Sequence, residues 1–169
     1  MKILLHDLSP DEFSQIFPGG ISEIRTIGPK DKVHACVGCR SCWLKMPGEC
    51  PIHDRAGRLG TELSATDELW IISACTYGCV SPFIKKVVDR MMPYQTPFLE
   101  IQDNETRFKN RYSDGFLLKV LFYGCDDTGE RKYADEYVKR LGKSLGVSDV
   151  ITYFCSDDEL MALGNEVLL

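Results

Sequence analysis

Short, almost continuously apolar runs alternate with helical patterns along the chain, and this alternation constrains the fold most. The two longest runs, residues 69–74 and 116–123, are rich in residues that favour strands. A strand that is apolar on both faces is typical of the middle of a parallel sheet that is covered by helices. Residues 2–5 and 150–154 predict two further strands, and residues 21–27 predict an edge strand. The pattern therefore predicts an α/β fold with a parallel sheet and helices on both faces.

Helices are predicted in the intervals between these strands. Ser9, Pro10 and the two acids that follow are typical of a helix start, and this first helix is expected to be short. Residues 82–92 and 128–145 show helical spacing of apolar residues, and Gly146 is a typical helix end. A weaker helix is predicted over residues 54–65, and a short one after Cys155. Residues 93–115 show no clear pattern and predict a long irregular segment, and a segment of this kind is usually either functional or wrongly assigned.

The loops that follow the strands are the expected place for a ligand site. In open parallel sheets, ligands bind at the carboxyl ends of the strands. Three loops leave this edge, at residues 7–11, 73–81 and 123–128. A cysteine-rich segment, residues 33–53, follows the second predicted strand, and we expect it at the same edge.

Four of the eight cysteines lie within fifteen residues of this segment, at Cys36, Cys39, Cys42 and Cys50. Their spacing, C-x2-C-x2-C-x7-C followed by Pro51, is typical of ligands to a cubane iron–sulfur cluster. Two other interpretations stay open. The four thiolates can hold a structural zinc ion, with His53 as a further ligand, or they are free thiols in a tight loop.

Composition and charge argue against several functional classes. The chain has 20 Lys and Arg against 25 Asp and Glu, so general binding to nucleic acid or to an anionic membrane is not expected. No apolar run is long enough to span a membrane, and the first residues lack the features of a signal peptide. We therefore expect a cytoplasmic protein with reduced thiols. Eight cysteines in that compartment indicate metal or redox chemistry rather than disulfides.

The chain resembles the flavodoxin-like NAD(P)H-dependent FMN reductases, and within them the iron–sulfur flavoproteins. The cysteine motif matches theirs in spacing and in its place after the second strand. After the third strand, Ser73, Gly78 and Ser81 match the family's T-P-x-Y-x-G-x-x-S segment, and Lys85 matches a lysine in the helix that follows. The resemblance extends over about residues 33–145.

This resemblance implies a three-layer sandwich around five parallel strands in the order 2-1-3-4-5. It also implies FMN, NAD(P)H as reductant, a [4Fe-4S] cluster on the four motif cysteines, and a homodimer or homotetramer. The implied cofactor-binding residues are Ser9, Pro10, Ser73, Ala74, Cys75, Thr76, Tyr77, Gly78, Cys79, Ser81, Gly124 and Cys125. Three of these are cysteines near the expected flavin edge, where they are either redox-active thiols or small buried side chains.

The expected phosphate loop departs from the family pattern. Of the family's G-S-P-R-x-x-G-N-T, only Ser9 and Pro10 are present, with Leu8 in place of the first Gly and Asp11 in place of the Arg. A phosphate at a helix start needs free backbone N–H groups and favourable charge. Asp11 and Glu12 place carboxylates there instead, and helix capping is the better interpretation of both.

We therefore expect a single domain over residues 1–169, with the cysteine-rich insertion at 33–53 and a long loop at 93–115. The expected function is a flavin-dependent NAD(P)H oxidoreductase or electron-transfer flavoprotein that passes electrons to an unknown acceptor. No residue is predicted to act as a general acid or base. The alternative is a flavin-free, degenerate flavodoxin-like domain that binds a partner or a metal.

Overall fold

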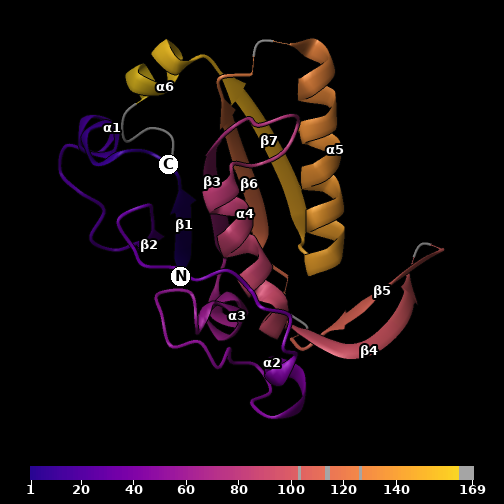
Figure 1. The fold of residues 1–169 in the computed structure, drawn as a ribbon. Helices are drawn as coiled ribbons and strands as arrows, with labels where there is room; N and C mark the ends of the chain where they lie inside the picture. Colours follow the sequence, from indigo (N-terminus) through magenta and orange to yellow (C-terminus); the bar gives the residue numbers. More distant parts are fainter. Residues whose placement is uncertain (103, 113–114, 126, 164–169) are drawn as a thin grey trace.

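Five parallel strands form the centre of the protein in a computed structural model that describes residues 1–102, 104–112, 115–125 and 127–163 (Figure 1). Across the sheet the order is β2-β1-β3-β6-β7. The strands are β1 (Lys2–His6), β2 (Arg25–Ile27), β3 (Glu68–Ala74), β6 (Leu117–Tyr123) and β7 (Asp149–Cys155). The numbers differ from the expected 2-1-3-4-5 because two strands of a separate hairpin, β4 and β5, precede β6 in the chain.

Alternate residues of the sheet face two separate hydrophobic layers. On one face, Leu4, Trp70 and Ile72 pack with residues of α1 (Pro10–Ile16) and α6 (Asp157–Leu163). On the other face, the alternating apolar residues of β1, β3 and β6 pack with α4 (Pro82–Val88), α5 (Thr128–Leu145) and α3 (Leu59–Glu62). Successive residues of each strand thus point to opposite faces of the sheet, and the apolar side of a helix layer covers each face. This arrangement gives the expected three layers.

Most of the predicted helices are present, and several of them have different ends. α5 has the predicted bounds, with Asp127 as its N-cap and Gly146 as its left-handed C-cap. The predicted helix over residues 82–92 changes after Val88 into a 3-10 helix, η2 (Asp89–Tyr94), which contains Pro93. The predicted helix over residues 54–65 is reduced to α3 and the 3-10 helix η1 (Leu63–Ala65). Of the expected final helix, residues 164–169 lie outside the described part of the chain.

The expectation of a long irregular segment at residues 93–115 is wrong, because this segment contains an antiparallel hairpin. Its strands are β4 (Gln95–Gln102) and β5 (Glu105–Asn110), and Figure 1 shows it projecting from the body of the protein. Most of its side chains are at least partly exposed on both faces, and apolar and polar residues alternate only over residues 99–102, so the pattern that marks a half-buried strand is short.

The cysteine-rich segment lies at the amino-terminal edge of the sheet, so its expected place at the carboxyl edge is wrong. The segment contains α2 (Ser41–Leu44), which lies near α3 and the hairpin (Figure 1). The indole N–H of Trp43 donates a hydrogen bond to the carbonyl oxygen of Met92, in η2. The helix α4 starts at the carboxyl edge of the sheet and runs antiparallel to β3. Because η2 directly continues α4, it lies at the amino-terminal edge. The connection from β2 to β3 thus carries the cysteines across the molecule.

Within the described part of the chain, no helix has both the length and the apolar character needed to cross a membrane.

Candidate functional site

The four motif cysteines line one pocket of about 250 Å³, here called the cysteine pocket. Cys36 and Cys39 are exposed, Cys50 is half-buried and Cys42 is buried. Burial raises the pKa of the Cys42 thiol, and the charges of the other three thiols raise it further. Hydrogen bonds from the backbone and side chain of Ser41 lower the pKa of Cys39. All four motif cysteines therefore line the same pocket.

The spacing of these thiols differs from that of a single metal site. In the described part of the chain, no three of them have sulfur atoms within 4.8 Å of one another. A zinc ion with Zn–S bonds of about 2.3 Å needs sulfurs about 4 Å apart. A cubane cluster is itself several ångströms across and separates its ligand sulfurs more widely. The described thiols therefore do not form a preformed site for a single metal ion.

A buried ion pair forms the wall behind the cysteine pocket. Arg90, only 1% exposed, donates hydrogen bonds of 2.8 and 2.9 Å to the two carboxylate oxygens of Asp54. It also donates to the carbonyl oxygens of His34 and Ile52. Among the described residues, its Nε atom has no hydrogen-bond partner. Burial lowers the pKa of Arg90, but Asp54 and the nearby Cys50 raise it overall, so the pocket is backed by a fixed positive charge.

At the opposite edge, the carboxylate of Asp7 joins the ends of three strands. It accepts hydrogen bonds from the backbone N–H of Ala74 at 2.9 Å and from the hydroxyl of Tyr123 at 2.9 Å. Burial, then the charge of Asp7 and its hydrogen bond, raise the pKa of Tyr123, so its hydroxyl stays protonated. A carboxylate of the protein thus lies between the loops where the sequence predicted an anionic ligand.

The start of α1 is likewise occupied by the protein's own side chains. Ser9 and Glu12 form a capping box, in which each side chain accepts a hydrogen bond from the other residue's backbone N–H. The hydrogen bonds of Ser9 lower the pKa of Glu12, which therefore carries its negative charge. Capping is the interpretation that the sequence favoured, and it leaves these two N–H groups unavailable to a phosphate.

Residues 75–79 form a tight turn after β3. The backbone N–H groups of Thr76 and Cys79 donate to each other's carbonyl oxygens, and Tyr77 and Gly78 have φ angles of 52° and 70°. The N–H of Gly78 donates to the carboxylate of Glu130 at 3.0 Å. Tyr77 is 96% exposed at the tip. The turn borders a pocket of about 620 Å³, the carboxyl-edge pocket, whose other lining residues include Asp127, Gly129, Glu130 and Tyr133.

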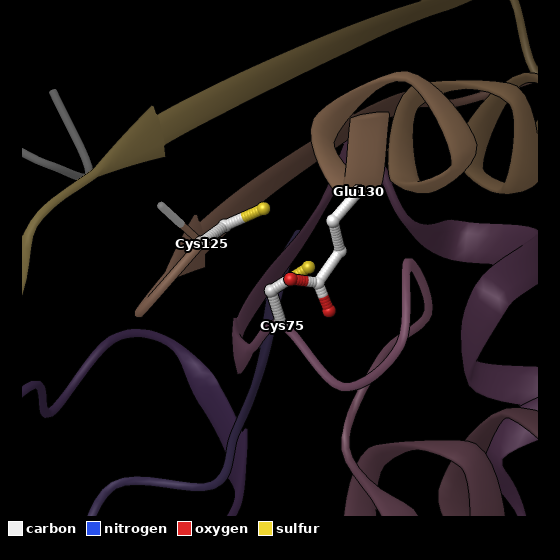
Figure 2. A group of neighbouring side chains, drawn as sticks. All are labelled: Cys75, Cys125 and Glu130. Carbon is white, nitrogen blue, oxygen red and sulfur yellow. The ribbon is translucent and has the colours of Figure 1, made fainter. Parts of the chain in front are cut away.

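A second group of metal-binding side chains lies beside this turn. Cys75, Cys125 and Glu130 converge in Figure 2, and their sulfur and carboxylate oxygen atoms all lie within 4.8 Å of one another. Burial, then a hydrogen bond with Cys125 and the charges of Cys125 and Glu130, raise the pKa of Cys75 to about 12. Without a cation, this thiol is protonated at neutral pH.

The residues predicted to bind a cofactor do not form one set. Ser9 and Pro10 lie at the start of α1. The buried hydroxyl of Ser73 accepts a hydrogen bond from the N–H of Ser81, so these two hold the base of the turn. Cys75, Thr76 and Tyr77 line the carboxyl-edge pocket, whereas the other predicted residues are not among its lining residues: Ala74, Gly78, Cys79, Gly124 and Cys125.

Sequence reasoning missed Asp7, Tyr123, Glu130 and the pair of Arg90 and Asp54. Asp7 directly follows β1 and Glu130 lies in the first turn of α5, so their positions at strand and helix ends were a usable signal. The partner of Arg90 lies 36 positions away in the chain, and no local pattern connects the two.

No protein-family model matches the chain, and no curated protein matches it in sequence. Solved structures do match it in fold. An FMN-dependent NADH-azoreductase from Bacillus anthracis, solved with FMN, is 13% identical, with a TM-score of 0.55 over 95% of this chain and 92% of that one. Smu.1420 from Streptococcus mutans is 15% identical, with a TM-score of 0.59 over 99% and 96%.

An NAD(P)H:quinone oxidoreductase from Methanothermobacter marburgensis is 10% identical, with a TM-score of 0.52 over 96% of this chain and 92% of that one. These likenesses cover nearly the whole length of each protein. Together with the strand order, they identify the fold of this chain as flavodoxin-like.

Proposed function

We propose that this protein is a flavin-dependent NAD(P)H oxidoreductase with an electron-transfer centre at its motif cysteines. The observation that carries the proposal is the carboxyl-edge pocket, which lies where open α/β sheets bind ligands and is large enough for a flavin ring. The FMN-dependent azoreductase and the quinone oxidoreductase share this fold over nearly their whole length, which supports the same cofactor and reductant.

The carboxyl-edge pocket fits the ring of FMN better than its phosphate. Tyr77 and Tyr133 offer aromatic faces to a ring bound there. A phosphate at α1 would have to displace the carboxylate of Glu12 from the N–H of Ser9. When bound, FMN supplies hydride chemistry with NAD(P)H. The chain's own part is to hold the ring through residues 75–77 and to shield one of its faces.

The cysteine pocket fits a [4Fe-4S] cluster in its donors and surroundings. Cys36, Cys39, Cys42 and Cys50 provide four thiolates, the usual ligands of such a cluster. A cluster with four thiolates is negatively charged, and the buried cation of Arg90 lowers the cost of holding it. The rings of Trp43 and Phe108, with centroids 4.9 Å apart, limit access of water.

The proposal also covers assembly and location. Exposed apolar residues of the hairpin favour a homo-oligomer, either a dimer or a tetramer. A reducing compartment such as the cytoplasm keeps the eight cysteines as thiols or thiolate ligands. The electron acceptor is a small molecule or protein of unidentified class.

The second candidate is a flavin-free domain that binds a metal or a partner. It is favoured by one feature, the occupation of the expected phosphate site by Asp7 and Glu12. The two candidates differ in a directly measurable property, retention of FMN.

The test is the absorption spectrum of anaerobically purified protein, with flavin, iron and zinc measured on the same sample. Flavin bands that are bleached by NADH or NADPH, with about four iron atoms per chain, support the full proposal. Cys39→Ser is expected to lower the iron content, whereas Cys155→Ser, at the end of β7, is the matched control. A colourless protein that also fails to bind added FMN would overturn the first candidate and support the second.

A further inference from the structure

We propose that Cys75, Cys125 and Glu130 form a binding site for a thiophilic divalent cation of the Zn²⁺ class, separate from the cysteine pocket. The site extends beyond the proposed oxidoreductase function. Cys75 and Glu130 also line the pocket proposed for the flavin ring, so the two ligands would compete and the site is tested without flavin. Its three donors come from two neighbouring strand ends and from the first turn of α5 (Figure 2).

The backbone around the three donors is fixed by the sheet and by α5. Ala74 pairs with Tyr123 in the register of β3 and β6, and the N–H of Cys75 donates to the carbonyl oxygen of Tyr123 at 2.9 Å. The guanidinium of Arg131 donates to the carbonyl oxygen of Cys125 at 2.8 Å. These contacts hold both cysteines beside each other whether or not a cation is bound.

Glu130 is oriented by a hydrogen bond that leaves it able to bind a metal. One carboxylate oxygen, Oε1, accepts the N–H of Gly78 at 3.0 Å. Metal-binding side chains typically make such a hydrogen bond to a neighbouring group, because it fixes the direction of the ligand. The other carboxylate oxygen, Oε2, can bind a metal while Oε1 keeps its hydrogen bond to Gly78.

The distances are close to those of a tetrahedral zinc site. The donor atoms lie within 4.8 Å of one another, and ligands around a zinc ion with bonds of 2.0–2.3 Å are about 3.5–4 Å apart. The donor atoms therefore need to move closer together by about 1 Å or less to reach the separations of a tetrahedral zinc site. Three protein donors leave a fourth position for water or a ligand, as in catalytic rather than structural zinc sites, and the adjacent carboxyl-edge pocket offers the space.

The main competing interpretation is a pair of thiols that forms a disulfide. Thiol–disulfide exchange needs a thiolate. The carboxylate of Glu130 lies within 4.8 Å of both sulfur atoms, and its negative charge disfavours a thiolate there. The same negative charge attracts a divalent cation, which in turn stabilises both thiolates. The carboxylate therefore favours a metal site over a redox pair.

The experiment measures binding of Zn²⁺, and of Co²⁺ as a spectroscopic probe, without added flavin. The cysteine pocket is first disabled by Cys36→Ser and Cys39→Ser, both at exposed positions. In this background we expect one Zn²⁺ per chain, release of about two protons on binding, and a thiolate-to-Co²⁺ absorption band. Adding Cys75→Ser should abolish all three. Cys79→Ser, on the same turn but outside the group, should leave them unchanged.

Glu130→Gln separates loss of a ligand from loss of the fold. Glutamine can still accept the N–H of Gly78 but lacks the charge, so Zn²⁺ affinity should fall at least tenfold while the thermal midpoint of the metal-free protein stays the same. The proposal is overturned if the background variant binds no Zn²⁺, if Cys75→Ser or Glu130→Gln leaves binding unchanged, or if Cys75 and Cys125 are recovered as a disulfide from the anaerobic protein.

Because no flavin is added, a failed zinc result leaves the oxidoreductase proposal intact, and a failed flavin result leaves the zinc proposal intact.

Discussion

At the scale of single residues, the pair of Arg90 and Asp54 is the most constrained contact near the cysteine pocket. The side chain of Asp54 is 5% exposed and that of Arg90 is fully buried. Burial alone would raise the pKa of Asp54, but hydrogen bonds from Arg90 and from the His34 N–H outweigh it and lower the pKa to about 2. The carboxylate therefore stabilises the fold in its charged form.

Asp54→Asn is expected to lower the free energy of unfolding by about 3 kcal/mol, because it leaves the Arg90 cation buried without a counter-charge. Urea denaturation at pH 7 measures the loss. Lys85→Ala is the matched control, since it breaks the exposed pair of Lys85 and Asp89 and should cost less than about 1 kcal/mol. Equal losses in the two variants would contradict the assigned role of the buried pair.

The same pair predicts a pH dependence with a definite sign. The pKa of Asp54 rises from about 2 in the folded state to about 3.9 in the unfolded chain. Its stabilising contribution is therefore complete above pH 4 and is lost as the pH falls towards 2, by roughly 2 kcal/mol. Denaturation curves between pH 5 and 2 should show a steeper loss in the wild type than in Asp54→Asn. Parallel curves would exclude Asp54 as the group responsible.

Glu12 is the residue that decides how open the expected phosphate site is. Glu12→Ala frees the N–H of Ser9 and removes one negative charge. The dissociation constant for FMN should therefore fall about tenfold, because the repulsion between Glu12 and the phosphate is worth about 1.4 kcal/mol. Fluorescence titration with FMN measures it. Glu12→Gln, which removes the charge but keeps an acceptor, should give a smaller gain. Unchanged affinity in both variants would place the phosphate elsewhere.

At the scale of elements, the buried strands could be predicted from the sequence, whereas the exposed hairpin and the place of the cysteine-rich segment could not. The strands β3 and β6 are buried on both faces, so their apolar runs marked them clearly. The hairpin has no buried face, and its sequence carries no such mark. The four motif cysteines line one pocket, because they are close together in the chain. Their place at the amino-terminal edge depends on where the β2–β3 connection crosses the molecule, which local pattern does not specify.

The turn at residues 75–79 is an element whose shape depends on one glycine. At Gly78, φ is +70°, and an added Cβ would come within 2.6 Å of the Cβ of Tyr133 on α5. Gly38 has φ of +66° with nothing within 4 Å of an added Cβ. Gly38→Ala therefore isolates the cost of the left-handed conformation, about 1 kcal/mol, whereas Gly78→Ala adds a clash with α5.

We expect Gly78→Ala to lower the free energy of unfolding at least twice as much as Gly38→Ala does, and to open the turn away from α5. Chemical denaturation of the two variants gives the ratio, and limited proteolysis around Tyr77 reports the opening. If the two alanines cost the same, the turn does not pack against α5 as described.

At the scale of the whole molecule, the hairpin carries the most exposed apolar surface outside the two candidate sites. Leu99 and Ile101, two residues apart on β4, lie on one face and are 64% and 78% exposed. Leu99 pairs with Phe108 of β5, which contacts Trp43 in the cysteine pocket. This apolar face therefore runs from the tip of the hairpin to the pocket. Apolar faces of this kind usually bind another protein surface, and the proposed homo-oligomer provides one.

Leu99→Lys with Ile101→Lys should convert the proposed oligomer into monomers, because each lysine would have to leave water at the interface. Light scattering coupled to gel filtration measures the molar mass. Lys109→Glu, next to Phe108 but on the opposite face of β5, is the matched control and should leave the mass unchanged. If cluster binding needs the second subunit to cover the cysteine pocket, iron content falls with the mass. If the wild-type protein is monomeric at every concentration, the hairpin does not mediate assembly, and Phe108 contributes only to the cysteine pocket of its own chain.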